Sequence, residues 1–241
     1  MKRNSLIHRL WQNWVPPALR DKKWLFRFLL RTQKANPRII EMCCEFKEKL
    51  PYMSSEDIVA YYERFAQLTA QPTGADLCVG SDTVSFIQGY ANEHPQFHKW
   101  LDCACGGGGL SLSLAAIGLD VTGVDFVIRE DLLNNEKVTF IEADIRELPF
   151  EEASFDVTVS AHTLEHIVQI QKAISELRRV TKHTLIVIVP CQREYLYTYD
   201  FHVHFFPYKE AFHRIMENPN AECFISDNDI VYIEKITKDH R

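Results

Sequence analysis

The second half of the sequence alternates short apolar runs with amphipathic stretches, and this alternation restricts the fold more than any other feature of the chain. Strands that are separated by helices pair in parallel through right-handed crossovers, and ligands bind at the carboxyl ends of such strands. We therefore predict an α/β fold with a ligand crevice along one edge of its sheet. The predicted strands cover residues 99–104, 120–125, 137–142, 155–160 and 184–189, and the predicted helices cover 109–117 and 167–180.

The chain finishes with a hairpin signal. Residues 221–226 and 230–236 flank the triplet Asp227-Asn228-Asp229, which is typical of a tight turn. A hairpin reverses the direction of the chain, so we expect one antiparallel strand at or near the edge of the sheet.

The first part of the chain has helical periodicity. Basic residues recur every three or four positions between residues 19 and 34, so a helix there would gather them on one face. A second helix is expected from Ser54 or Ser55 to about Leu68. We divide the chain into an N-terminal helical cap, residues 1–77, and a main domain, residues 78–241. The basic residues of the first helix are Arg20, Lys23, Arg27, Arg31 and Lys34, and its other side would present Trp24, Leu25, Phe28 and Leu29.

Charge is distributed unevenly along the chain. Residues 1–50 hold twelve Lys and Arg against four Asp and Glu, a net +8, while the whole chain carries −6, so the remainder carries −14. This disfavours a uniformly basic nucleic-acid-binding protein but leaves room for a local basic surface. The sequence has no run long enough to span a membrane and no signal-peptide pattern, and its seven cysteines form no Cys-x-x-Cys pair, so we expect a cytoplasmic protein.

Four consecutive glycines, residues 106–109, lie where the first predicted strand ends and a helix of small residues begins. Glycines let the backbone approach a ligand closely, and a helix N-terminus offers free N–H groups. Such a turn alone is weak evidence, because nicotinamide-binding folds and phosphate-binding loops use one too, and it can also be a merely tight turn.

Two carboxylates at later strand ends make the evidence more specific. Asp125 ends the second strand, where an acid can accept hydrogen bonds from both hydroxyls of a ribose. Asp144 follows the third strand, where it could accept from an adenine amino group with Ile145 beside the ring. Together they predict a site for an adenosine-containing ligand.

These motifs resemble those of class I S-adenosylmethionine-dependent methyltransferases, in particular the small-molecule, type 11-like branch. The resemblance covers residues 98–190 and rests on Leu101 to Gly109, Asp125, the stretch from Asp144 to Phe150 and the Phe-Asp pair at 155–156, with Ala104 in place of the usual first glycine. It implies a Rossmann-like, mostly parallel seven-stranded sheet with one antiparallel strand, an N-terminal helical extension, and S-adenosyl-L-methionine as cofactor. A nicotinamide site is disfavoured because Ser111 stands where its motif expects a third glycine. The implied cofactor-binding residues are Asp102, Ala104, Gly106, Gly108, Asp125, Phe126, Asp144, Ile145 and Ala161.

The end of the fourth strand should face the reacting methyl group. It carries His162, Glu165 and His166, two imidazoles and a carboxylate within five residues, which we take as the candidate catalytic residues. Three interpretations stay open: the segment is scaffold, or one histidine is the general base for an oxygen nucleophile, or a divalent metal binds here. The metal interpretation is motivated by a resemblance to quinone-precursor and small-RNA 2'-O-methyltransferases, and His202 and His204 from a later loop could join the set.

The favoured function is methyl transfer to a small-molecule acceptor, most simply to oxygen, with a histidine as general base. The alternatives are a metal-assisted RNA 2'-O-methyltransferase and a non-catalytic adenosyl-ligand-binding protein. The basic segment 19–34 has three explanations: a solvated charged face, contact with a membrane surface, or contact with RNA phosphates. The sequence specifies neither the acceptor nor the oligomeric state.

Overall fold

The computed structural model describes residues 14–69, 80–197 and 200–237. The chain divides into two compact units, which are treated separately here. The sheet unit comprises the described parts of Thr73–Cys191 and Tyr208–Arg241, and the helical unit comprises the described part of Met1–Pro72 together with Gln192–Pro207. No helix within the described ranges is long and apolar enough to cross a membrane.

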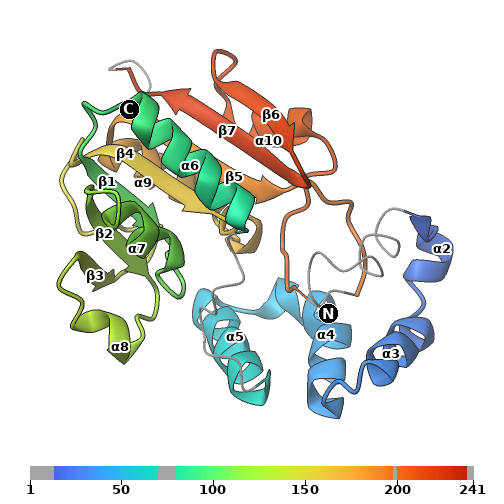
Figure 1. The fold of residues 1–241 in the computed structure, drawn as a ribbon. Coiled ribbons are helices and arrows are strands. Elements are labelled where there is room, and N and C mark those ends of the chain that lie inside the picture. Colours follow the sequence, from blue (N-terminus) through green and yellow to red (C-terminus); the bar gives the residue numbers. More distant parts are fainter. Residues whose placement is uncertain (1–13, 70–79, 198–199, 238–241) are drawn as a thin grey trace. The chain divides into compact units, whose positions relative to one another are not determined.

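The sheet unit is built on seven strands in the order β3-β2-β1-β4-β5-β7-β6 (Figure 1). Strands β1 to β5 pair in parallel, and β7 pairs antiparallel with both β5 and β6. The predicted seven-stranded, mostly parallel sheet with one antiparallel strand is therefore confirmed. The strands are β1 (Lys99–Cys103), β2 (Asp120–Asp125), β3 (Val138–Glu142), β4 (Phe155–Ala161), β5 (Thr181–Pro190), β6 (Glu222–Ser226) and β7 (Asp229–Lys235).

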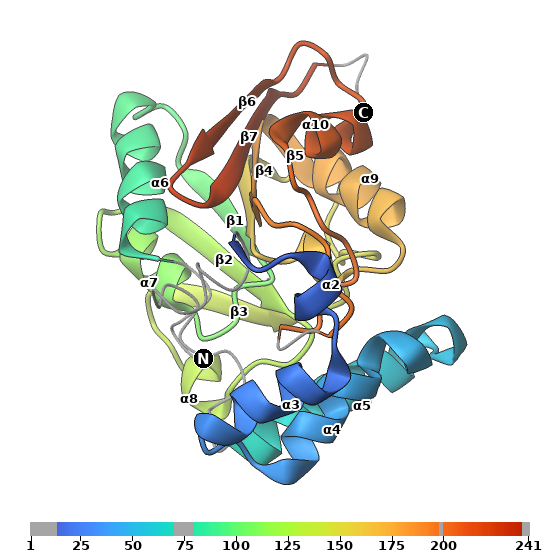
Figure 2. The ribbon, with the colours of Figure 1, turned by 90° about the vertical axis from the view of Figure 1, so that its right-hand side faces the viewer.

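Helices cover both faces of this sheet. Helices α6 and α7 lie on one face and α9 and α10 on the other, as the two views in Figures 1 and 2 show. The core of the α6 side joins Ile87 and Leu114 from the helices to Trp100, Val159 and other buried strand residues. The helices of this unit are α6 (Ser81–Glu93), α7 (Gly109–Ala115), α8 (Glu130–Leu133), α9 (Ile170–Val180) and α10 (Lys209–Met216), with a short 3-10 helix, η2 (Leu164–His166).

The helical unit contains α2 (Pro17–Arg20), α3 (Lys23–Thr32), α4 (Pro37–Lys49), the 3-10 turn η1 (Leu50–Tyr52) and α5 (Ser55–Thr69). Its core also takes in the later segment Gln192–Pro207, through Phe201. The Phe201 ring is 2% exposed and lies 4.7 Å from the Phe65 ring and 5.0 Å from the Phe46 ring, measured between centroids. Burying this ring removes a large apolar surface from water, so the segment after β5 is fixed to the N-terminal helices.

The single helix predicted over residues 19–34 is wrong in two respects. The chain forms α2 and α3, separated by a turn at Asp21 and Lys22, and Arg20 is buried with its guanidinium donating to the carbonyl of Glu194. The buried side of α3 carries Phe26 and Leu30. Trp24 and Phe28, predicted for the side opposite the basic residues, are 68% and 61% exposed.

A buried ion pair joins helix α9 to the antiparallel strand β7. The Arg178 guanidinium lies 3.0 Å from the Glu234 carboxylate, which is fully buried and also accepts a 2.8 Å hydrogen bond from the Tyr232 hydroxyl. Arg178 also donates to the carbonyl of Met216, at the end of α10. One arginine thus joins two helices and a strand on the same face of the sheet.

Replacing Glu234 alone should therefore be costly, because a buried guanidinium loses its counter-charge. We expect Glu234→Leu to lower the free energy of unfolding by about 3–5 kcal/mol, measured by urea denaturation. The double variant Arg178→Met/Glu234→Leu should recover at least half of that loss, since it leaves no unpaired charge. Equal losses in the single and double variants would contradict this account.

Candidate functional site

The glycine-rich turn after β1 has a backbone that favours residues with small side chains. Ala104, Gly106 and Gly108 all have positive φ, of 66°, 54° and 76°. A Cβ on Gly108 would lie 2.9 Å from the ring of Phe140 on β3, so this glycine is also required by packing. Ala104 adopts the left-handed conformation despite its side chain, where the resembling family has glycine.

Asp125, at the end of β2, connects this turn to the next loop. Its Oδ2 accepts a 2.7 Å hydrogen bond from the backbone N–H of Gly106, and its Oδ1 accepts one of 2.7 Å from Phe126. Burial raises the pKa of the Asp125 carboxyl, although these backbone donors oppose the shift. A carboxylate has about four lone-pair sites, so it can also accept from a ligand hydroxyl.

Asp102 lies in β1 beneath the turn and is 2% exposed. It accepts a 2.6 Å hydrogen bond from the Ser111 hydroxyl of α7. Burial raises the pKa of Asp102 to about 6, and the neighbouring charge of Asp125 acts in the same direction. Among the described residues, no lysine or arginine forms an ion pair with Asp102 or Asp125.

Asp144 follows β3 and, unlike Asp102 and Asp125, forms an ion pair with a neighbouring arginine. Its carboxylate accepts from the backbone N–H of Arg146 at 2.8 Å and forms an ion pair with the guanidinium of the same residue. The Arg146 hydrogen bond holds the pKa of Asp144 below its usual value. Ile145 is buried beside it. A ligand amino group would therefore share this carboxylate with Arg146.

The remaining predicted cofactor residues also lie at this edge of the sheet. Parallel pairing places the carboxyl ends of β1 to β4 on one side, and Ala161 is the last, buried residue of β4. Phe126, directly after Asp125, is 49% exposed. The sheet thus brings to one edge all nine residues predicted to bind the cofactor, whereas contact with a cofactor stays a prediction.

His162 follows Ala161 and has a positive φ of 55°. This buried imidazole lies between two carboxylates: Nδ1 is 3.6 Å from Glu165 Oε1, and Nε2 is 3.3 Å from Asp229 Oδ2. After Thr163 the chain forms the 3-10 helix η2, which contains Glu165 and His166.

Glu165 has one imidazole on each side of it. Its side chain is fully buried, and Oε1 lies 4.0 Å from Nε2 of His166 as well as near His162. The His166 side chain is 26% exposed, against 4% for that of His162. His166 is therefore the more accessible of the two predicted bases. His202 and His204, predicted as possible further members of this group, belong to the helical unit.

Sequence reasoning missed three residues of this region. Ser111 was noted only as the residue that breaks a nicotinamide motif, although it bonds Asp102. Gly123 leaves room for the Phe140 ring, which would lie 2.7 Å from a Cβ there. Asp229 was used only as a turn signal, yet its pairing with Pro190 brings it to the edge where β5 ends. Of these three, only Asp229 could have been found from the sequence. The predicted antiparallel strand begins beside the carboxyl end of the strand with which it pairs, and Asp229 stands at that beginning.

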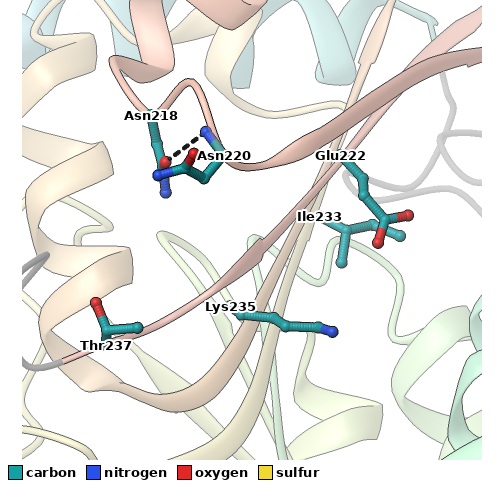
Figure 3. Close-up of a pocket in the computed structure, with 6 residues that line it drawn as sticks. All are labelled: Asn218, Asn220, Glu222, Ile233, Lys235 and Thr237. Carbon is teal, nitrogen blue, oxygen red and sulfur yellow. Dashed lines mark hydrogen bonds between the residues drawn. The ribbon is translucent and has the colours of Figure 1, made fainter.

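A separate, open pocket of about 280 Å³ lies at the other edge of the sheet (Figure 3). Glu222 at the start of β6 and Lys235 at the end of β7 line it, with Asn220 bonded to Asn218 at 3.0 Å. Lys235 pairs with Thr184, near the beginning of β5. This pocket is therefore not the crevice expected at the carboxyl ends of the strands.

The raised pKa of Asp102 leads to a prediction about stability. Because the folded protein takes up this proton more readily than the unfolded chain, the Asp102 carboxyl adds to the free energy of unfolding as the pH falls from about 6 toward about 4, opposite in sign to acids with lowered pKa values such as Asp144 and Glu176. Asp102→Asn should lose this gain, which amounts to at most about 3 kcal/mol, and should be more stable than the wild type at neutral pH. Urea denaturation across this pH range measures both effects.

Asp120→Asn is the matched control for this variant, because Asp120 is exposed at the start of β2. It should keep the wild-type pH dependence. The same pH dependence in Asp102→Asn would show that burial does not perturb the Asp102 carboxyl.

The segment of the chain that forms this site matches a known protein family. Residues 101–189 match the family described as "Methyltransferase domain". The chain is 34% identical over 91 residues to the sterol 4-C-methyltransferase of Caenorhabditis elegans, a match covering 34% of this chain and 27% of that protein. It is 39% identical over 88 residues to the demethylmenaquinone methyltransferase of Clavibacter sepedonicus, covering 34% of this chain and 36% of that protein. The chain thus spans about a third of the length of these relatives.

Solved structures share the fold across a longer stretch. The 1,6-didemethyltoxoflavin-N1-methyltransferase of Burkholderia thailandensis aligns with a TM-score of 0.56 at 16% identity, covering 76% of this chain and 87% of that one. A protein from Pyrococcus horikoshii OT3 aligns with a TM-score of 0.52 at 19% identity, covering 65% and 90%. At these identities the likeness concerns the fold alone.

Proposed function

We propose, from the premise that residues 101–189 form a class I S-adenosylmethionine-dependent methyltransferase domain, that this chain transfers a methyl group to a small-molecule acceptor. The observation that carries the proposal is a pair of carboxylates beside the glycine-rich turn, the buried Asp102 and the half-buried Asp125. Burial raises the pKa of both, and no lysine or arginine within the described residues forms an ion pair with either. S-adenosylmethionine carries a sulfonium and an ammonium group against one carboxylate. A ligand with net positive charge would offset the cost of burying these two acids.

The residues at this edge fit such a cofactor. Asp125 would accept from the ribose hydroxyls while it keeps its bonds to the Gly106 and Phe126 amides. The turn at residues 104–108 would approach the methionine part, and Asp144 with Ile145 would contact the adenine. The bound cofactor supplies an electrophilic methyl group, and the chain's own residues would orient the acceptor and remove its proton.

A change at Asp125 tests the cofactor site. Asp125→Asn replaces one accepting oxygen with an NH₂ group that faces a backbone N–H, so it both removes a ribose acceptor and loosens the turn. We expect S-adenosylhomocysteine to bind at least about 100-fold more weakly, by isothermal titration calorimetry, a loss of roughly 3 kcal/mol.

Asp120→Asn is again the control, since it alters the opposite end of the same strand. It should bind the ligand as the wild type does. Unchanged affinity in Asp125→Asn, or no binding by the wild type, would remove the basis of the proposal. Tight binding without any turnover would instead indicate a non-catalytic adenosyl-ligand-binding protein.

The acceptor is proposed to be a small molecule that is methylated on oxygen. The names of the relatives describe proteins acting on a sterol and on demethylmenaquinone, both small molecules. The sterol 4-C-methyltransferase and the toxoflavin-precursor N1-methyltransferase are named for other acceptor atoms, so the preference for oxygen rests on this chain's own histidines. A neutral imidazole is a suitable base for a hydroxyl proton near neutral pH.

His166 is the better candidate for this base. It is the more exposed imidazole, and the adjacent Glu165 carboxylate would stabilise the imidazolium formed when it takes up a proton. His162 already faces the carboxylates of both Glu165 and Asp229, which makes it a positioning residue for Glu165. The fully buried Glu165 carboxylate, held in place by His162, would in turn orient the His166 imidazole.

The two histidines can be separated by substitution. We expect His166→Asn to lower kcat by about 10²- to 10⁴-fold and to remove the acid limb of the pH–rate profile. His162→Asn, in which asparagine tolerates the left-handed backbone, should cause a smaller loss and keep that limb. Both variants should keep the wild-type affinity for S-adenosylhomocysteine.

Full activity in His166→Asn would exclude it as the base. Loss of wild-type activity in a chelator, restored by added Mn²⁺, would assign these side chains to a metal instead. Activity on an oligonucleotide but on no small molecule would favour the RNA alternative.

A further inference from the structure

We propose that the outward face of helix α3 docks on the surface of an anionic phospholipid bilayer. This face consists of Trp24, Phe28 and Arg31, which lie one helical turn apart along α3 and are all exposed. Large aromatic side chains exposed in a row on one helix face are uncommon in a soluble protein and mark an interaction surface. The inference does not depend on the proposed enzymatic function.

The helix is anchored through its opposite side, so its outward face is defined. Phe26 and Leu30 are 5% and 2% exposed in the core of the helical unit. The Lys23 ammonium nitrogen lies 3.5 Å from a carboxylate oxygen of Glu48 on α4, and a guanidinium nitrogen of Arg27 lies 2.5 Å from a carboxylate oxygen of Glu41 on the same helix. These contacts hold α3 against α4 and leave Trp24 and Phe28 directed away from that core.

The charges around this face are positive. Lys22 precedes α3, Arg31 lies in its last turn and Lys34 follows it; all three are exposed. Within the described part of the chain, no carboxylate forms an ion pair with any of them. Cations beside an aromatic surface match a bilayer that presents anionic headgroups over an apolar interior.

The aromatic side chains themselves suit the headgroup region. Tryptophan is enriched at membrane–water interfaces because its ring is apolar and its indole N–H finds polar partners. Trp14 and Leu19, 79% and 52% exposed, precede α3 in the same unit and add further exposed apolar surface.

Lipid fits this surface better than RNA does. Affinity for RNA depends on the number of phosphates that cations neutralise. Of the five basic residues predicted to line one face, Arg20 is buried, and Lys23 and Arg27 are paired with acids of α4. Of these five, only Arg31 and Lys34 are exposed for contact with a polyphosphate, whereas the Trp24 and Phe28 rings are exposed for contact with lipid.

Vesicle co-sedimentation of the full chain tests the proposal. Vesicles of phosphatidylcholine mixed with phosphatidylglycerol should carry the protein down, and vesicles of phosphatidylcholine alone should carry much less. Trp24→Ser/Phe28→Ser should weaken binding at least about tenfold. Arg31→Gln/Lys34→Gln should weaken it roughly fivefold for each charge removed, with a smaller remaining dependence on salt.

The matched control is Tyr52→Ser/Tyr208→Ser, which removes two aromatic side chains that are 89% and 61% exposed elsewhere on the chain. It should bind vesicles as the wild type does. Tryptophan fluorescence gives an independent measurement: lipids with brominated acyl chains should quench the wild type, and Trp24→Phe should show clearly less quenching. This single change keeps an aromatic ring, so it preserves the fold.

Three results would overturn the proposal. The first is a wild type that stays in solution with anionic vesicles at low salt. The second is equal vesicle binding by the wild type and Trp24→Ser/Phe28→Ser. The third is a different partner for this face in a protein that does not bind vesicles. That partner would be RNA if the protein binds RNA and Arg31→Gln/Lys34→Gln abolishes the binding. It would be a second copy of the chain if ultracentrifugation shows self-association that Trp24→Ser/Phe28→Ser abolishes.

Discussion

The carboxylate of Asp125 is the interaction on which the candidate site depends. It accepts one backbone N–H from the turn after β1 and one from the loop after β2, so one side chain sets the spacing of these two segments. The parallel pairing of β1 with β2 makes this geometry available, because it brings Cys103 and Val124 into register just below both loops. Burial raises the pKa of Asp125 and Asp102 alike, so the fold accepts an electrostatic cost at this edge. Sites that bind cations commonly accept such a cost in the empty protein.

Much of the sheet unit could be predicted from the sequence, because its signals are local. The observed strand Asp120–Asp125 coincides with its prediction, and the hairpin around Asp227-Asn228-Asp229 forms as expected. The seven-stranded, mostly parallel sheet with one antiparallel strand and the resemblance to class I methyltransferases are also confirmed. The sequence pattern did not predict which side chains contact one another. The Arg146 ion pair on Asp144 and the approach of Asp229 to His162 depend on loop geometry and on strand pairing.

The first helix shows how periodicity can mislead. Spacings of three and four residues correctly indicated a helix, but they did not show which side would be buried. The apolar residues occur all around α3, and the side chosen for burial is the one on which Lys23 and Arg27 can reach the carboxylates of α4. That choice depends on α4, which begins at Pro37 after an Asn36 cap and lies outside the pattern of α3 itself. The pairing of the two helices therefore decided which aromatic residues stay in water.

The division of the chain between its units has a consequence for its assembly. Because Gln192–Pro207 belongs with the N-terminal helices, the polypeptide enters the helical unit twice, and the sheet is built from two stretches of sequence. No single cut can therefore release either unit intact. A fragment that starts after the helices would keep Phe201 but lack the rings of Phe46 and Phe65 that surround it. During synthesis, the helices must likewise await almost the entire sheet before their aromatic core can close.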